Sequence, residues 1–218
     1  MVSLSEQEWT GLRDNPLFAG KTWRWSPEAW SLLPESREML ASLAPAAVSF
    51  YRAIERLYLK SKGNGKILRN EEILVPWVAE YYDAGKPDWL IEHAGSLAVR
   101  DLLPAVLRPD LLPVSGGMAL TEWDAVPGGI GLTAQLGSAY LGEGAPSMVD
   151  DFGEALAHTA SSFGGKQANM LIVVSEESET YRPEMQWLAD ELSERGFSIG
   201  VAGPEELEIT DEGVCKDG

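Results

Sequence analysis

The sequence predicts a mixed α/β fold with a largely helical N-terminal region. Apolar residues recur at helical spacing in the first half of the chain, whereas alternating and continuous apolar runs appear only after Pro109. The second half also contains a strand–helix–strand pattern. With 218 residues, 44% of them hydrophobic, the chain can bury a sizeable core. We expect a helical region over residues 1–107, packed on an α/β core over residues 108–218.

Three helices are expected in the first half. Residues 35–60 carry apolar side chains at helical spacing, and we expect Pro45 to break or to start an element there. Residues 62–66 are predicted to form a loop, residues 71–83 a second helix, and residues 91–103 a third helix that Pro104 closes.

Four tryptophans, at positions 9, 23, 25 and 30, crowd the N-terminus. We interpret them as large rings that pin an N-terminal arm to the domain. A surface that stacks sugars or peptides is the alternative.

The second half begins with an alternating strand over residues 118–123, followed by a Gly-rich turn and by helices over about 132–140 and 149–163. Residues 170–174 form a continuous apolar run, which is typical of a strand buried on both faces. A helix beginning near Pro183 and ending at Gly196 separates this run from the alternating residues 197–201. Such a βαβ unit predicts two parallel strands. A short hairpin over 207–216, cut off near the end of the chain, completes the prediction.

The chain is strongly acidic, with a formal net charge of −17. Such a charge repels phosphate backbones and anionic lipids, so neither nucleic acid nor a membrane is an expected partner. The longest uncharged stretch, residues 125–142, contains five glycines and a proline and makes a poor membrane span. Because Cys215 is the only cysteine and no signal peptide is evident, we expect a cytoplasmic protein.

Signatures of independent catalysis are missing. The two histidines, His93 and His158, have no cysteine or second histidine at metal-ligand spacing. Neither a G-x-S-x-G nucleophile motif nor a P-loop is present. We therefore assign no catalytic residue and no metal ligand in this chain.

The Gly-rich turn after Trp123 is the first candidate binding site. Gly129, Gly131 and Ala134 satisfy the G-x-G-x-x-[GA] dinucleotide pattern between a strand and a helix. Glu122 and Asp124 precede the turn, however, and two carboxylates repel a pyrophosphate. They suit an amine or a hydroxyl better. A tight strand-to-helix turn without a ligand and a dinucleotide site both remain open alternatives.

A second candidate cluster follows the strand ending near Val174. If the strands that end at Trp123 and Ser175 are parallel, both clusters line one crevice at the carboxyl edge of the sheet. The alternative is a helix N-terminus whose glutamates complement the helix dipole. The substrate-binding residues predicted from the two clusters are Glu122, Asp124, Pro127, Gly128, Gly129, Thr133, Ser175, Glu176, Tyr181 and Arg182.

A basic stripe interrupts the acidic chain. Arg52, Arg56 and Lys60 are spaced four residues apart and share one helix face, and Lys62, Lys66 and Arg69 follow. We predict an interface for an acidic partner or for the phosphates of a ligand held elsewhere. A solvated helix face is the alternative.

Residues 108–112, 118–133, 173–183 and 204–218 resemble the N-terminal region of circularly permuted ATP-grasp ligases of the glutathionylspermidine-synthase-like type, most distinctively in the run Glu122-Trp-Asp-Ala-Val-Pro-Gly-Gly129. The resemblance implies a Rossmann-like, three-layer pre-ATP-grasp domain. In that family, ATP and Mg²⁺ activate a carboxylate as an acyl phosphate, which an amine then attacks. Glu122, Asp124 and the turn over 127–129 are implied to face the substrate cleft.

The same resemblance implies the cofactors and partners. The residues of an ATP-grasp domain that bind ATP and Mg²⁺ have no counterpart in this chain, so we expect the chain to hold no cofactor and to be inactive alone. Its expected partners are a small amine or peptide-like substrate and a C-terminal ATP-grasp domain, in the same or a separate chain. Two other classes remain as rivals: an interaction domain that docks through the basic 52–69 face, and a nucleotide-binding oxidoreductase domain.

Overall fold

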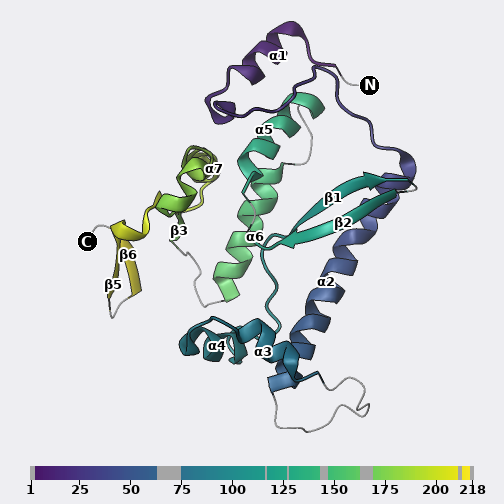
Figure 1. Ribbon diagram of the computed structural model, residues 1–218. Helices are drawn as coiled ribbons and strands as arrows, with labels where there is room; N and C mark the ends of the chain where they lie inside the picture. The colour runs from purple at the N-terminus through teal and green to yellow at the C-terminus, as the bar shows by residue number, and fades with distance from the viewer. Residues whose placement is uncertain are drawn as a thin grey trace. The chain divides into compact units, whose positions relative to one another are not determined.

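The computed structural model, shown in Figure 1, describes residues 3–62, 75–115, 117–126, 128–142, 147–162, 169–210 and 213–216. Helices and small sheets both occur, which confirms the mixed α/β class. The chain divides into two compact units. The first comprises Met1–Ser31, Ala105–Leu111 and Leu120–Gly218, and the second comprises Leu32–Pro104 and Leu112–Ala119. These boundaries differ from the expected segments 1–107 and 108–218, because the N-terminal arm belongs to the first unit.

A strand pair runs through both units. The strands β1 (Arg108–Val114) and β2 (Gly117–Asp124) form a two-stranded sheet, and the predicted strand over 118–123 is thereby confirmed. Only two residues separate the strands, so they are antiparallel, because a parallel pair needs a long crossover. The hydroxyl of Thr121 donates to the carbonyl oxygen of Asp110 at 2.9 Å, which ties the two strands where they belong to the first unit.

The first unit also contains most of the other described elements: α1 (Glu6–Arg13), η1 (Pro16–Phe18), α5 (Ile130–Leu141), α6 (Met148–Ser162), β3 (Met170–Val173), η3 (Glu176–Tyr181), α7 (Arg182–Glu194), β4 (Ile199–Ala202), η4 (Pro204–Glu206), β5 (Leu207–Thr210) and β6 (Gly213–Lys216). The predicted βαβ unit is confirmed, because β3 and β4 are parallel partners and α7 connects them. The predicted hairpin is confirmed as the antiparallel pair β5–β6.

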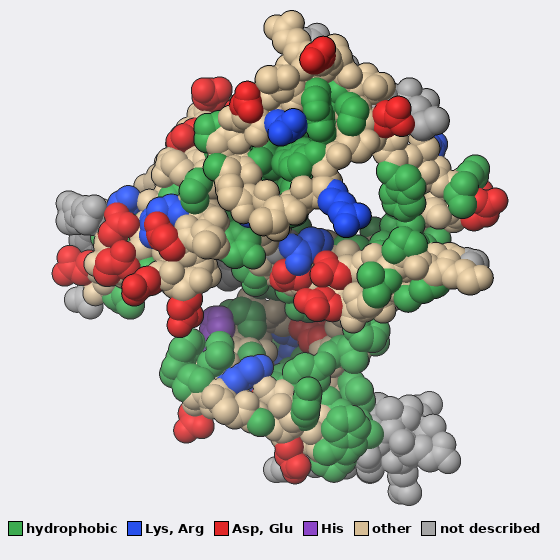
Figure 2. Space-filling view, turned by 45° about the horizontal axis from the view of Figure 1, so that its top comes forward, with side chains coloured by type: hydrophobic (Ala, Val, Ile, Leu, Met, Phe, Trp, Pro, Cys, Tyr) green, Lys and Arg blue, Asp and Glu red, His purple; other side chains and the backbone are tan. Residues whose placement is uncertain are grey.

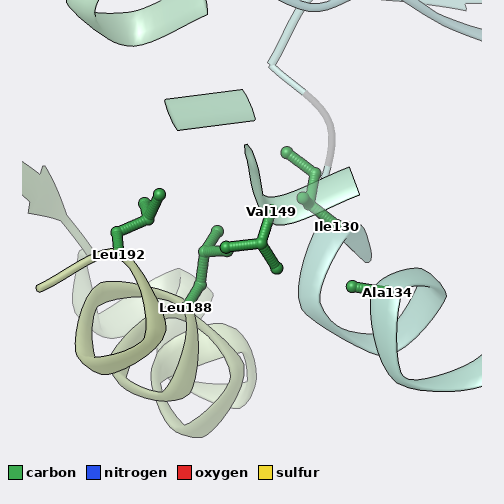
Figure 3. Packing of buried hydrophobic residues seen from close by; sticks show 5 residues of the cluster. All are labelled: Ile130, Ala134, Val149, Leu188 and Leu192. Atoms are coloured by element: carbon green, nitrogen blue, oxygen red, sulfur yellow. The ribbon is translucent and has the colours of Figure 1, made fainter. Parts of the chain in front are cut away.

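Helix α7 forms the centre of the first unit. Leu188 and Leu192 have no exposed surface and pack against a cluster completed by Ile130, Ala134 and Val149, as Figure 3 shows. On its other side, Ala189 packs against Val174 and Val201 of the β3–β4 layer. Full burial of one such leucine contributes about 1.5–3 kcal/mol. The helix therefore joins α5 and α6 to the β3–β4 pair.

The expectation that residues 170–174 are buried on both faces is wrong. Leu171 and Val173 are 37% and 47% exposed, whereas Val174 is buried. Within the described ranges the strands form three separate two-stranded sheets, so β3 has a single neighbour, β4, and α7 covers one face of this pair. The continuous apolar run thus predicts burial on two faces of the strand, whereas the described elements cover only one.

Two cationic side chains satisfy carbonyl groups of the β3–β4 ladder. The parallel register would pair the Val174 carbonyl with residue 204, but Pro204 has no N–H. Arg182 replaces that donor, with its Nη2 atom 3.0 Å from the Val174 oxygen. On the opposite edge of β4, Lys216 Nζ donates to the Val201 oxygen at 2.9 Å. Side-chain N–H groups therefore donate to carbonyl groups that backbone N–H groups would bind in a larger sheet.

The N-terminal arm is pinned by large rings, as predicted. Leu4, Leu12 and Phe18 share a buried cluster with Leu132 of α5. Trp9, Trp23 and Trp25 surround this cluster through tilted and edge-to-face contacts, such as the 5.1 Å separation between the Phe18 and Trp25 ring centroids. Trp30 differs, because 74% of its surface is exposed.

In the second unit, α2 (Pro34–Lys62) continues without a break through Pro45, so the expectation that Pro45 breaks or starts an element is wrong. A proline inside a helix removes one backbone hydrogen bond and crowds the preceding turn. The surrounding residues 41–47 include four alanines, the best helix formers, and Ala47 is buried. These neighbours keep the helix continuous despite the cost.

The other helices of this unit are α3 (Trp77–Asp83) and α4 (Asp88–Gly95). The start of the predicted helix 71–83 lies outside the described residues. The helix predicted over 91–103 begins earlier and ends at Gly95, since the backbone is extended at Ser96 and left-handed at Asp101. Tyr58 donates its hydroxyl hydrogen to Asp83 at 2.6 Å, and Lys62 Nζ lies 3.3 Å from the same carboxylate. These contacts connect α2 to α3.

The Asp83 contact predicts a pH-dependent stability of the second unit. The hydrogen bond from Tyr58, helped by Lys62, lowers the pKa of Asp83 below its ordinary value. A lowered pKa means that the charged carboxylate stabilises the fold above the ordinary value near 4, and that this contribution is lost as the pH falls through the lowered pKa.

Asp83→Asn is therefore expected to cost roughly 1 kcal/mol at pH 7 and progressively less as the pH falls below about 4. Urea unfolding measured between pH 3 and pH 7 checks this, with the exposed Glu80→Gln on the same helix as the control. A difference between Asp83→Asn and wild type that stays constant over this range would contradict the prediction.

Candidate functional site

The turn between β2 and α5 depends on glycine. Gly129 is the residue that precedes α5, and its φ of +88° lies in the left-handed region that favours glycine. The N–H of Thr133 donates to the Gly129 carbonyl at 2.9 Å, which begins the helical hydrogen-bonding pattern. Pro127 lies outside the described residues. The predicted helix that follows the turn is confirmed as α5.

Helix α7 and the segment before it pack directly on this turn. A Cβ atom on Gly128 would overlap the ring of Tyr181, and one on Gly131 would lie 2.9 Å from a ring carbon of Trp187. The N–H of Gly131 donates to Glu184 Oε1 at 2.9 Å, and Glu184 is 4% exposed. The glycines at 128 and 131 therefore permit a close contact between α5 and the 181–187 segment.

This contact changes the interpretation of the glycine pattern. The N-terminus of a helix presents unpaired N–H groups and a partial positive charge, which suit an anion. Here the carboxylate of Glu184 already accepts the hydrogen bond of the Gly131 N–H. A pyrophosphate at the same position would meet a buried negative charge, so the packing contact favours the tight-turn interpretation over dinucleotide binding.

Arg108 fixes the other side of the turn. Its Nη1 donates to the Gly128 carbonyl at 3.1 Å, its Nη2 lies 3.2 Å from Asp124 Oδ2, and its Nε lies 3.1 Å from Asp110 Oδ1. Asp124 also accepts the N–H of Val126 at 2.9 Å. Asp124 is thus paired within the fold, while Glu122 is exposed with no ion pair to a described residue. The pattern of acids before the turn did not indicate this arginine, although Arg108 opens the strand β1.

The residues predicted after β3 have mainly structural contacts. Ser175 precedes η3, Glu176 is exposed, and the Tyr181 ring lies against Gly128. Arg182 binds Glu179 at 2.7 Å and the Val174 carbonyl. The hydrogen bond to Glu179 raises the pKa of Arg182. In the described sheets β2 and β3 are not neighbours, so the expected shared sheet edge is absent there. The two clusters meet instead through Gly128 and Tyr181.

Beside the turn lies a hollow of about 420 Å³, formed within the first unit and called here the turn hollow. Gly128, Gly129 and Thr133, three of the predicted residues, line it. Its charged lining residues are Arg108 and Asp151. The rest of the wall is apolar and includes Val106, Leu107, Pro109, Ile130, Met148 and Phe152.

Asp151 gives the turn hollow its chemical character. It lies in the first turn of α6, is exposed, and its carboxylate forms no hydrogen bond or ion pair with a described residue. Arg108, in contrast, already faces two carboxylates. The hollow therefore combines an apolar wall with one unpaired carboxylate. This arrangement suits a ligand with an apolar body and a cationic or hydrogen-bond-donating end. Asp151 lies 22 residues beyond Gly129 in sequence, and only the fold brings it there.

The remaining predicted residues do not line this hollow. Glu122, Asp124, Ser175, Glu176, Tyr181 and Arg182 lie outside its lining. The basic residues Arg52, Arg56 and Lys60 are exposed on α2 in the second unit. Lys62 pairs with Asp83, and Lys66 and Arg69 lie outside the described residues.

The fold and this site define a mixed α/β chain whose first unit has a glycine-bounded hollow with one acid that pairs with no described residue. Comparisons of the chain with protein-family models, with curated proteins and with solved structures give no match. No helix in the described ranges is both long and apolar enough to cross a membrane. Among those residues, no group of three or more His, Cys, Asp or Glu side chains is placed to hold a metal ion.

Two glycines of α5 give a matched test of the α5–α7 contact. A methyl group at Gly131 meets Trp187 and Glu184, so Gly131→Ala is expected to destabilise the fold by roughly 1–3 kcal/mol. Gly137 has no atom within 4 Å of its Cβ position, so Gly137→Ala is expected to stabilise by about 0.5–1 kcal/mol. Urea unfolding measures both. Equal effects of the two substitutions would contradict the proposed close contact.

Arg108→Gln is expected to loosen the turn. It removes the donor to Gly128 and the partner of Asp124, at a cost of roughly 1 kcal/mol for a partly exposed pair. Amide hydrogen exchange of Val126 and of residues 128–131 should accelerate, and the effect on stability should shrink at high salt. Arg52→Gln, which removes an exposed arginine without a described partner, serves as the control. Unchanged exchange in the Arg108 variant would contradict this role.

Proposed function

We propose that the chain is a substrate-binding, non-catalytic domain of an ATP-dependent carboxylate–amine ligase, and that it binds a small amine or peptide-like substrate in the turn hollow. The single observation that carries the binding role is the Asp151 carboxylate, which has no partner among the described residues and lies at a largely apolar hollow whose other charged residue, Arg108, already faces two carboxylates. An ammonium group gains charge-assisted hydrogen bonds from such a carboxylate, while an alkyl stem contacts the apolar wall.

The charge distribution supports a cationic ligand. The first unit holds eight Lys and Arg residues against 24 Asp and Glu, a balance of −16, whereas the second unit holds nine against ten. Acidic side chains are prominent on the surface shown in Figure 2. A field of this sign raises the local concentration of cations and repels free phosphates. The first unit is therefore better suited to receive an amine than a nucleotide.

The ligase assignment rests on the resemblance of residues 118–133 to ATP-grasp ligases of the glutathionylspermidine-synthase-like type. Under this proposal, the β3–α7–β4 unit is part of a Rossmann-like, three-layer pre-ATP-grasp fold. ATP and Mg²⁺ are bound by an ATP-grasp domain, in the same or a separate chain. We place the protein in the cytoplasm, where ATP is available and a lone thiol such as Cys215 stays reduced.

Calorimetric titration of the chain with n-pentylamine tests the binding role, because this probe joins an apolar stem to one ammonium group. Asp151→Asn is expected to weaken binding about fivefold or more, since a charge-assisted hydrogen bond at a partly exposed site contributes roughly 1 kcal/mol. Glu154→Gln, an exposed acid on the same helix outside the hollow, should leave the affinity unchanged.

The amine site and the non-catalytic role can be overturned separately. Equal affinities for n-pentylamine and for the neutral n-pentanol, or an unchanged affinity in Asp151→Asn, would remove the amine site. Tight binding of ATP–Mg²⁺ by this chain alone would remove the non-catalytic role, because the nucleotide is assigned to another domain.

A second candidate function is protein docking through the basic face of α2. Arg52, Arg56 and Lys60 are exposed and have no acidic partner among the described residues, whereas the adjacent Lys62 is paired with Asp83. Unpaired like charges along one helix face suit an acidic partner. Reversal of all three residues to Glu should abolish capture of such a partner in a pull-down. An unchanged complex would exclude this face.

A further inference from the structure

A second hollow lies between the N-terminal arm and the C-terminal half of α5, within the first unit, and is called here the tryptophan hollow. Its volume is about 340 Å³. Trp23, Trp25, Trp30 and Tyr140 supply four aromatic rings to its lining. This hollow shares no lining residue with the turn hollow, and it is separate from the function proposed above.

Two of the four rings expose a large part of their surface. Trp30 and Trp23 are 74% and 46% exposed, whereas Trp25 is partly buried against the arm cluster. The face of an indole ring carries partial negative charge and attracts cations. The Nζ of Lys21 already lies 5.9 Å from the centroid of the Trp23 ring, so a cation is accommodated at this ring within the chain itself.

The hydrogen-bonding groups of the tryptophan hollow are mostly engaged within the chain. Tyr140 donates its hydroxyl hydrogen to the Ser26 carbonyl, and Ser26 Oγ donates to the Glu28 carbonyl at 3.0 Å. Ser26 Oγ also accepts the N–H of Glu28 at 3.1 Å. Apart from the Glu28 carboxylate, few acceptors therefore remain among the described lining residues for the N–H groups of a primary amine. A cation without N–H groups does not need such acceptors, because it interacts with the ring faces.

Two charged side chains of opposite sign complete the lining. Glu28 and Arg24 are both exposed, and neither side chain forms an ion pair with a described residue. The acidic balance of the first unit favours a cationic ligand over an anionic one. We propose that the tryptophan hollow binds an alkylated ammonium group, such as a trimethylammonium, against its exposed rings with Glu28 as the counter-charge.

Nuclear magnetic resonance of the indole N–H groups tests this site ring by ring. Choline chloride is titrated into the ¹⁵N-labelled chain, and 3,3-dimethylbutan-1-ol, its neutral isostere, serves as the matched control ligand. Choline is expected to give saturable shifts at the indoles of Trp23 and Trp30, and the alcohol is expected to give none. Equal shifts with both ligands would overturn the cation assignment, and so would saturable binding of methyl glucoside without binding of choline.

Variants separate the rings from the charges. Trp30→Ala and Glu28→Gln are each expected to weaken choline binding about two- to fivefold. Arg24→Gln should strengthen it, because a like charge is removed. Trp77→Ala replaces an exposed tryptophan of the second unit and should have no effect. Since Trp30 and Glu28 are exposed, these substitutions are expected to leave the fold intact, which the remaining indole shifts verify. Unchanged affinity in both variants would overturn the site.

Two further arms identify the source of the ligand and separate the two sites. A peptide containing trimethyllysine that binds more tightly than choline indicates a modified protein as the source, and the opposite order indicates a free metabolite. Asp151→Asn should leave choline binding unchanged, because Asp151 lines only the turn hollow. Loss of choline binding in Asp151→Asn would assign the cation to the turn hollow and overturn the present inference.

Discussion

The close contact between α5 and α7 is the constraint on which the first unit depends. The buried carboxylate of Glu184 accepts the N–H of Gly131, and the rings of Tyr181 and Trp187 lie where side chains at positions 128 and 131 would otherwise be. Leu188 and Leu192 continue α7 from this contact into the cluster formed with α5 and α6. Because α7 also carries β3 and β4 on its other side, the contact determines where that strand pair is attached. A bulkier residue at position 131 would therefore disturb more than one neighbour.

The same contact decides which ligands the turn can accept. A glycine-rich strand-to-helix turn is often an anion site, because its N–H groups and the helix dipole both favour negative charge. In this chain a side-chain carboxylate fills that position from within, and Arg108 binds the Gly128 carbonyl from the other side. The Gly131 N–H and the Gly128 carbonyl of the turn are thus both engaged within the fold. Next to the turn lie the apolar wall and Asp151, whose carboxylate has no partner among the described residues, and under the proposed function these groups suit a cation instead.

The parts of the fold that depend on local sequence were predictable, and the parts that depend on distant contacts were not. The apolar stripe of α7, Pro183 in its first turn and Gly196 after its end predicted the βαβ unit, because each signal acts within a few residues. The expected break at Pro45 does not occur, because the tolerance of a proline depends on the whole surrounding helix. The exposure of Val173 could not be predicted, because the number of strands in a sheet is not encoded in any single strand.

Within the candidate site, Gly128, Gly129 and Thr133 follow from the turn pattern. The pairing of Asp124 with Arg108 and the position of Asp151 arise only from tertiary packing.

Charge and hydrogen bonding together explain why two hollows in the same acidic unit differ in their expected ligands. The field of the unit favours cations at both, but a long-range field does not distinguish one cation from another. Discrimination comes from the groups at short range. At the turn hollow the Asp151 carboxylate, which has no partner among the described residues, would accept hydrogen bonds from N–H donors, and a cation without N–H groups would lose those bonds. At the tryptophan hollow the Tyr140 and Ser26 hydroxyls are already bonded within the chain, so the Glu28 carboxylate is the main acceptor left for N–H groups among the described lining residues. The ring faces attract an alkylated cation without requiring N–H groups. Under the two proposals the hollows prefer different cations, although each is lined by one acidic and one basic side chain.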